Sequence, residues 1–192
     1  AALPVMQARI ALGVLALLLL ASLTVLGVPA PAPGSASPQS DVALYEGIVS
    51  AVAHGEDYYR AAADALRAGS YPLRPFLTFR LPGLAVVQAA LPPLAALVLL
   101  GLLAAATAFA WYRRVREAVA RVPALVAALF LLAAGMRAFV QPGLIAFHEI
   151  WAGLFVALSL ALRRPGRWVE AAAVAMIAML IRETAALYVL VM

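Results

Sequence analysis

The sequence predicts an all-α integral membrane protein with about five transmembrane helices. Of its 192 residues, 66% are hydrophobic and only 12% are charged, whereas charged residues make up about a quarter of a soluble domain. Apolar runs recur along the chain, and each is long enough to cross about 30 Å of hydrocarbon as a helix of about 20 residues. These runs do not alternate with polar residues, which favours helices over barrel strands. We therefore interpret residues 1–192 as a single membrane domain.

The first predicted span covers residues 10–28 and follows Arg9. A cleaved signal peptide is the alternative, because small residues follow the run. The apolar core of about 19 residues exceeds the 7 to 15 residues of most signal peptides, so a retained span is favoured. The Pro-, Ala-, Gly- and Ser-rich stretch at 29–38 cannot continue a helix and is expected to lead out of the membrane.

A polar loop at residues 29–83 follows the first span, and we predict two short amphipathic helices within it. The first has Ser40 as its N-cap, and Leu44, Tyr45, Ile48, Val49 and Val52 fall at helical spacing on one face of it. The second covers residues 56–68 and ends at Gly69. Neither is long enough to cross a bilayer, so both are expected to lie at the membrane surface, with their apolar faces toward lipid or toward the bundle. Three prolines then make residues 71–82 extended.

Four further spans are predicted after this loop. They cover residues 92–112, 122–140, 144–162 and 168–192. Arginines gather on one side of the arrangement, namely Arg9, Arg113, Arg114, Arg116, Arg121, Arg163, Arg164 and Arg167. By the positive-inside rule this side is cytoplasmic. The loop at 29–83 is therefore expected to lie outside the cytoplasm, with Trp111 and Trp168 as interfacial anchors on the opposite side.

The composition excludes several classes of function. All 14 basic residues are arginine, and most lie beside predicted spans, so the net charge of +5 does not indicate nucleic-acid binding. The lack of cysteine excludes disulfides, thiol catalysis and thiolate metal sites. No Gly-rich phosphate loop is present, which argues against a nucleoside triphosphate substrate. The chain does not begin with Met and stops within an apolar run, so we expect a fragment of a longer protein.

Five ionisable residues lie in the interior of the predicted spans, away from the arginine-rich ends, namely Arg137, His148, Glu149, Arg182 and Glu183. A rise of about 1.5 Å per residue places all of them in the outer third of the bilayer, below the polar loop. Each costs several kcal/mol if it faces lipid, so such residues usually line a cavity or pair with one another. One interpretation is a structural network that joins Arg137 to Glu149 and Arg182 to Glu183. Because neighbouring helical residues point about 100° apart, one member of each adjacent pair can instead face a cavity.

The loop residues have structural and functional interpretations as well. Asp41, just inside a helix start, is either a capping residue or a reactive carboxylate. Asp57 is interpreted as the cap of the second helix. Tyr58 and Tyr59 either anchor the loop at the interface or stack on a sugar ring.

Two further interpretations concern charged ligands. Arg74 and Arg80 either bind lipid headgroups or hold a substrate phosphate, for which the planar guanidinium group is suited. A divalent cation held by Asp41 and Glu149 agrees with the preference of hard cations for oxygen ligands. No pair of histidines at ligand spacing supports a metal site.

The order of these features resembles that of the GT-C fold membrane glycosyltransferases. The resemblance rests on a first span followed by Asp41 and Tyr45, then Gly55, Tyr58 and Tyr59, and then the segment LRPFLTFRLP before the second span. The segments HEIWAG and IRETA are similar to the polar outer-face residues of such enzymes. The chain is shorter than those enzymes, which usually carry more spans and often a soluble domain.

The resemblance implies inverting transfer of a sugar from a polyprenyl-phosphate donor at the outer face of a bacterial inner membrane, with or without a divalent metal ion. Asp41 would be the general base that deprotonates the acceptor. The residues implied to hold the donor phosphate are Arg74, Arg80 and Arg182. Those implied to bind or orient substrates are Tyr45, Tyr58, Tyr59, Arg137, His148, Glu149 and Glu183. The alternative is a non-catalytic membrane subunit or transporter fragment with a structural charge network.

Overall fold

The chain is all-helical wherever its structure, a computed structural model, describes it. The described residues are 6, 10, 13, 14, 17, 38–74, 78–136, 139, 142–166 and 168–191, and no strand occurs among them. The all-α class is therefore confirmed. The chain divides into two units, Ala1–Ser37 and Pro38–Met192. In the first unit only five separate positions are described, all of them helical, so most of the predicted span at 10–28 lies outside the described residues.

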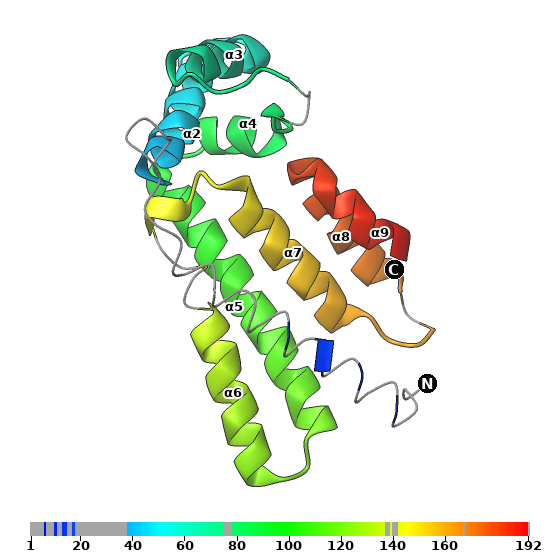
Figure 1. Ribbon diagram of the computed structural model, residues 1–192. Coiled ribbons are helices and arrows are strands. Elements are labelled where there is room, and N and C mark those ends of the chain that lie inside the picture. The colour runs from blue at the N-terminus through cyan, green and yellow to red at the C-terminus, as the bar shows by residue number, and fades with distance from the viewer. Residues whose placement is uncertain are drawn as a thin grey trace. The chain divides into compact units, whose positions relative to one another are not determined.

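The polar loop forms two short helices, α2 (Pro38–Ala53) and α3 (Tyr58–Ala68), and a third short helix, α4 (Gly83–Ala89), begins where the loop ends (Figure 1). We call these three the loop helices. Helix α2 begins two residues before Ser40, so the prediction that Ser40 is its N-cap is wrong. Asp57 caps α3 as predicted, because its carboxylate accepts a hydrogen bond from the backbone N–H of Arg60 at 3.0 Å. Gly69 ends α3, also as predicted.

Helices α2, α3 and α4 pack on one another through a shared apolar cluster. Its buried members are Ile48, Tyr58, Ala62 and Ala85. The remaining apolar positions of α2 pack against this cluster, namely Leu44, Tyr45, Val49 and Val52. The helical spacing of these α2 residues therefore identifies the correct face, and that face is turned toward the other loop helices.

Helix α5 (Pro93–Ala118) is the longest helix in the described part of the chain. Its 26 residues extend about 39 Å, and its most apolar 18-residue window has a mean hydropathy of 2.2. By length and composition, α5 alone among the described helices can cross a membrane by itself. Three shorter apolar helices follow, α6 (Val122–Met136), α7 (His148–Leu162) and α8 (Val169–Ile181). A five-span arrangement is thus not established by helix length.

Helix boundaries differ from the predicted spans at two places where charged residues lie. The predicted span at 144–162 starts as a 3-10 turn, η3 (Pro142–Leu144), and α7 begins only at His148. The predicted span at 168–192 is not one helix, because α8 ends at Ile181 and Arg182 is extended, with φ −141° and ψ 116°. As a result, His148 and Glu149 lie in the first turn of α7, and Arg182 directly follows the end of α8. None of the three lies in the middle of a helix.

After Arg182 the chain turns back on itself. A 3-10 turn, η4 (Glu183–Ala185), leads into α9 (Ala186–Val191), which lies beside α8 in Figure 1. The buried hydroxyl of Ser159 in α7 donates to the carbonyl of Ala171 in α8 at 2.7 Å and lies 2.9 Å from the hydroxyl of Tyr188 in α9. Ala171 lies near the start of α8, and Tyr188 lies in α9. Because both residues contact Ser159, α9 runs antiparallel to α8, back toward the start of that helix.

Helix α7 lies between α5 and α8 (Figure 1). The buried residues of this core come from α4, α5, α7 and α8, namely Leu84, Leu100, Ala104, Trp151, Ala152, Leu154 and Ile181. Two long side chains of α5 bind backbone carbonyls of α7. The indole of Trp111 donates to Ala157 at 2.9 Å, and the guanidinium of Arg114 donates to Ala161 at 2.7 Å. These bonds fix the register of α5 against α7.

Candidate functional site

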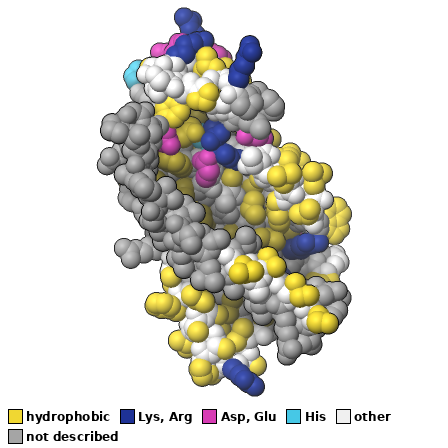
Figure 2. All heavy atoms as spheres, in the orientation of Figure 1, with side chains coloured by type: hydrophobic (Ala, Val, Ile, Leu, Met, Phe, Trp, Pro, Cys, Tyr) yellow, Lys and Arg dark blue, Asp and Glu magenta, His cyan; other side chains and the backbone are white. Residues whose placement is uncertain are grey.

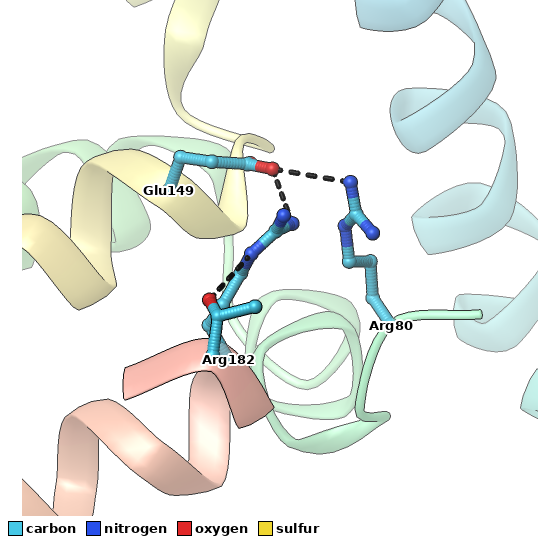
Figure 3. A network of polar contacts seen from close by, with 4 residues as sticks. Arg80, Glu149 and Arg182 are labelled. Carbon is cyan, nitrogen blue, oxygen red and sulfur yellow. Dashed lines mark hydrogen bonds and ion pairs between the residues drawn. The ribbon is translucent and has the colours of Figure 1, made fainter. Parts of the chain in front are cut away.

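Glu149 forms the centre of the candidate site. It lies in the first turn of α7, and its Oε1 atom accepts hydrogen bonds from both Arg80 and Arg182 (Figure 3). The Arg80 contact is 3.2 Å long. Arg182 additionally donates to the Thr184 hydroxyl at 3.3 Å. Three segments that are distant in the sequence therefore meet at one carboxylate.

In this cluster the guanidinium groups of Arg80 and Arg182 share one carboxylate, that of Glu149. The side chains of Arg80 and Arg182 are 18% and 19% exposed, whereas that of Glu149 is 42% exposed. The guanidinium groups are thus held in a sheltered position beside an opening to solvent. Such an arrangement is suited to bind an anion, because each guanidinium group has several N–H donors.

Helix α3 holds the segment that carries Arg80. Tyr58 is buried, with 7% of its surface exposed, and its hydroxyl donates to the backbone carbonyl of Arg80 at 2.9 Å. Burial raises the pKa of Tyr58, so the phenol keeps its proton at neutral pH and remains a donor. Because Tyr58 lies at the start of α3, just after the Asp57 cap, the start of this helix fixes the position of Arg80.

Asp41 lies in the first turn of α2 and accepts a hydrogen bond from the hydroxyl of Tyr71. Tyr71 follows α3 closely, and its ring packs over Gly69. A Cβ atom at position 69 would lie 2.6 Å from the Tyr71 ring, so only glycine leaves room for the ring in this position. Asp41 is thus oriented by a side chain from the end of α3. The helix does not begin at Asp41, which argues against an N-cap role.

Tyr45, one turn after Asp41, connects the loop helices to the start of α7. Its ring lies 5.6 Å from the rings of both Phe147 and His148. Burial raises the pKa of the Tyr45 phenol, and the charges that act on it come from Arg80, Glu149, Asp41 and Arg182. His148 is almost fully buried, with 2% of its surface exposed. Tyr45 therefore links the helix that carries Asp41 to the start of α7, where His148 and Glu149 lie.

A small cavity opens on the other side of Arg80. It has a volume of about 400 Å³, and its lining includes Tyr59, Phe79, Arg80 and Glu183. The Tyr59 ring is 52% exposed and lies edge-on to Tyr58, with ring centres 5.2 Å apart. Both carboxylate oxygens of Glu183 are buried and have no hydrogen-bond partner among the described residues. A buried carboxylate beside an aromatic wall can accept hydrogen bonds from a hydroxyl-rich ligand.

An apolar groove runs away from the arginine cluster along the helices below it. Its volume is about 630 Å³, and residues of α4, α5, α7 and α8 line it, among them Leu84, Leu102, Phe155, Leu180 and Ile181. Ile181 directly precedes Arg182, so the groove begins next to the cluster. The face of the molecule in Figure 2 shows the same order of polar and apolar surface. Charged side chains gather below α3, and hydrophobic side chains predominate further down.

The structure brings together most of the predicted site residues, but not all of them. Arg80, Glu149 and Arg182 form the cluster, and Tyr58, Tyr59 and Glu183 lie beside Arg80. Tyr45 contacts His148, which directly precedes Glu149, and Asp41 lies one turn before Tyr45 in α2. Arg74 is exposed and forms no polar contact with the described residues. Arg137 lies outside the described residues, and so does its predicted pairing with Glu149.

Two predicted interactions need comment. The pairing of Arg182 with Glu183 is wrong, because the helix break at Arg182 turns its side chain toward Glu149. The cation site of Asp41 and Glu149 gains no support, since no group of three or more His, Cys, Asp or Glu residues suited to a metal ion occurs in the described part of the chain. Glu149 also already accepts from two guanidinium groups, which compete with a metal ion.

Three residues at the site were not predicted, namely Tyr71, Phe147 and Thr184. Tyr71 had one signal in the sequence, its place directly after a helix that ends in Gly69. Phe147 and Thr184 had none, because their contacts depend on the helix breaks before His148 and after Ile181.

The fold and the site together define an all-helical protein with a sheltered arginine cluster next to an apolar groove. No protein-family model matches this chain, no curated protein is significantly similar to it, and no solved structure matches it significantly. The functional argument therefore depends on the site itself.

Proposed function

We propose that the chain is a membrane glycosyltransferase, or the catalytic module of one, that uses a polyprenyl-phosphate sugar at the extracytoplasmic face of a bacterial inner membrane. The observation that carries the proposal is the meeting of Arg80 and Arg182 on one oxygen of Glu149, at the end of an apolar groove. A polyprenyl-phosphate sugar complements both features, because its phosphate can bind the arginines and its hydrocarbon chain can lie in the apolar groove. The resemblance in sequence to the GT-C fold enzymes adds to this argument.

The proposed reaction is an inverting substitution at the anomeric carbon of the donor. An acceptor hydroxyl oxygen forms the new bond to this carbon, while the bond from the carbon to the phosphate oxygen breaks and its electron pair leaves with the phosphate. Asp41 takes the acceptor proton. Arg80 and Arg182 stabilise the charge on the departing phosphate. Tyr45, His148 and Glu149 position these groups, and Tyr59 and Glu183 contact the sugars.

In this proposal the span at 10–28 and helices α5, α6, α7 and α8 enter the bilayer, with the loop helices outside the cytoplasm. Helix α7 covers about 22 Å by itself, and the turn η3 extends it toward the outer face. Arg182 then lies at the outer end of α8, where the chain turns back as α9. This depth places the arginine cluster at the level of lipid phosphates.

The experiment compares Asp41→Asn with Asp64→Asn. Asp64 is an exposed aspartate on α3 that pairs with Arg67 at 2.7 Å, so its variant is a matched control away from the site. Membranes that contain each variant are supplied with a panel of radiolabelled polyprenyl-phosphate sugars, and transfer to endogenous acceptors is measured. We expect Asp41→Asn to lose transfer by roughly 100-fold or more while it still folds. Full transfer by Asp41→Asn would contradict the proposal.

A second candidate function, a structural charge network without catalysis, is favoured by the fact that Glu149 joins two arginines directly. In that case the triple change Arg80→Met, Glu149→Leu and Arg182→Met would restore stability that Glu149→Leu alone removes. The triple variant would also keep whatever non-catalytic activity the wild-type chain has in the cell. The glycosyltransferase proposal expects the triple variant to fold but to be inactive.

A further inference from the structure

Two cavities lie at the opposite end of α5 and α7 from the arginine cluster. The first, of about 520 Å³, lies between α5 and α7, and its lining includes Phe109, Arg113, Leu162 and Arg164. The second, of about 720 Å³, is lined by Arg163, Arg164, Trp168 and Val189, among others. Arg164 belongs to both cavities, so the two meet at this residue.

The charge at this meeting point is positive. Arg164 pairs with Glu117 at 2.9 and 3.1 Å, and no other carboxylate pairs with it among the described residues. Arg113 and Arg163 are exposed and form no ion pair in the part of the chain that the structure describes. Glu117 thus balances the charge of Arg164, while the charges of Arg113 and Arg163 are available to an anion.

The walls of both cavities are apolar. Phe109 is 61% exposed, Leu162 is 37% exposed, and Trp168 is 62% exposed, so large hydrophobic surfaces lie next to the arginines. A free phosphate ion would use the arginines but leave these surfaces in water. An uncharged helix would cover the surfaces but leave Arg113 and Arg163 without a counter-ion. An amphiphile with an anionic headgroup complements both features.

We propose that this pair of cavities, defined by Arg113, Arg163, Arg164 and their apolar walls, is a binding site for an anionic phospholipid. The headgroup phosphate binds the arginines, and the acyl chains lie against Phe109, Leu162 and Trp168. The site is separate from the proposed catalytic site, because α7 places about 22 Å between them. It rests on the insertion of the chain in a membrane and does not depend on glycosyl transfer.

The experiment measures lipid selectivity of the full chain in nanodiscs that contain equal amounts of phosphatidylglycerol and phosphatidylcholine. After detergent extraction, the lipids that remain bound are counted by native mass spectrometry. The wild-type chain should retain phosphatidylglycerol in preference to phosphatidylcholine. Removal of two charges by Arg113→Gln with Arg163→Gln should weaken this preference by about 30-fold, since each basic residue near an anionic surface contributes a roughly fivefold effect.

The matched control is Arg60→Gln with Arg121→Gln, which removes the same net charge from exposed arginines outside both cavities. This control should keep the preference for phosphatidylglycerol. An equal loss in the control would overturn the proposal, because it would indicate unspecific attraction. Full competition by water-soluble glycerol phosphate would also overturn it, since the acyl chains would then have no role. Cross-linking of the cavities to a protein, with no bound lipid, would assign them to a protein partner instead.

Discussion

Glu149 determines how the two arginines of the candidate site are held. A carboxylate between two guanidinium groups reduces their repulsion and directs both toward the same point. Because the Glu149 side chain is 42% exposed, solvent screens part of this interaction. The arginines are more sheltered than the carboxylate, so an anionic ligand that displaced Glu149 would find both guanidinium groups already in place.

A first prediction concerns this carboxylate. Glu149→Gln removes the charge that separates Arg80 from Arg182, so it should lower the free energy of unfolding by about 1 to 2 kcal/mol, the range between an exposed and a buried ion pair. Thermal unfolding in detergent at low salt measures the effect. Glu117→Gln, in a pair whose side chains are 44% and 45% exposed, serves as the control and should cost clearly less, because solvent screens both of its partners. Equal losses in the two variants would argue against a special role of Glu149.

A second prediction concerns Gly69. A methyl group at this position would lie 2.6 Å from the Tyr71 ring, so Gly69→Ala should displace Tyr71 from Asp41 and destabilise the chain by about 1 kcal/mol. The test is a double-mutant cycle with Tyr71→Ala, measured by thermal unfolding. Once the ring is absent, the added methyl group has space, so Gly69→Ala should become nearly neutral. Additive effects would show that the two residues do not interact.

At the scale of elements, helix ends create the site. Helix α3 positions Arg80 through Tyr58, the start of α7 carries His148 and Glu149, and the end of α8 carries Arg182. Helix ends leave backbone groups without intrahelical partners and let the next residues point in new directions. Each charged residue of the cluster therefore lies where a helix begins or ends, or in the segment between two helices.

A third prediction concerns the hydrogen bond from the Tyr58 hydroxyl to the backbone carbonyl of Arg80. Tyr58→Phe removes the donor to the Arg80 carbonyl and should cost about 1 kcal/mol of unfolding free energy. It should also weaken the binding of a lipid-linked phosphate, because Arg80 loses its support. Tyr59→Phe is the matched control, since Tyr59 is 52% exposed and its hydroxyl has no such partner among the described residues. Equal effects of the two changes on stability would rule out this support.

A fourth prediction concerns the reversal of α9. Ser159→Ala removes the hydroxyl that contacts both Ala171 and Tyr188, and should destabilise the packing of α7, α8 and α9 by about 1 to 2 kcal/mol. Ser50→Ala, at an exposed position of α2, is the control and should be within about 0.5 kcal/mol of the wild type. Thermal unfolding measures both. A neutral Ser159→Ala would indicate that α9 does not depend on this contact.

At the scale of the whole molecule, the arrangement has a polar end and a basic end. The loop helices and the candidate site lie at the end of α5 where the helix begins, and Arg113, Arg114 and Arg116 lie where it ends. In the proposed membrane insertion, the positive-inside rule would turn these two ends toward opposite sides of the membrane. The chain contains no cysteine, so single cysteines can be introduced without background labelling.

A fifth prediction follows from this polarity. In intact spheroplasts, a membrane-impermeant maleimide should label Arg74→Cys and Ser70→Cys, both exposed in the polar loop. It should label Arg116→Cys and Arg121→Cys only after the membrane is permeabilised. Gel shift of the labelled chain measures the result. Labelling of all four variants in intact spheroplasts, or the reverse pattern, would contradict the proposed orientation.

The sequence alone determined several features correctly for clear physical reasons. Apolar spacing identified the face of α2 that packs on α3, and Asp57 and Gly69 marked the two ends of α3, because caps and helix stops depend on local backbone chemistry. The high hydropathy identified an all-helical chain. Charges placed in apolar runs also identified the candidate site, since ionisable residues need partners there.

Only the tertiary structure decided how these residues pair. One interpretation of the sequence paired Arg182 with its neighbour Glu183 within a continuous helix, whereas the helix ends at Ile181 and Arg182 reaches Glu149. The contact of Tyr71 with Asp41 and that of Tyr58 with the Arg80 carbonyl also depend on packing between segments 22 or 30 residues apart. Hydropathy and spacing describe one segment at a time. The partners of a charged residue, in contrast, depend on which helix ends meet when the segments pack together.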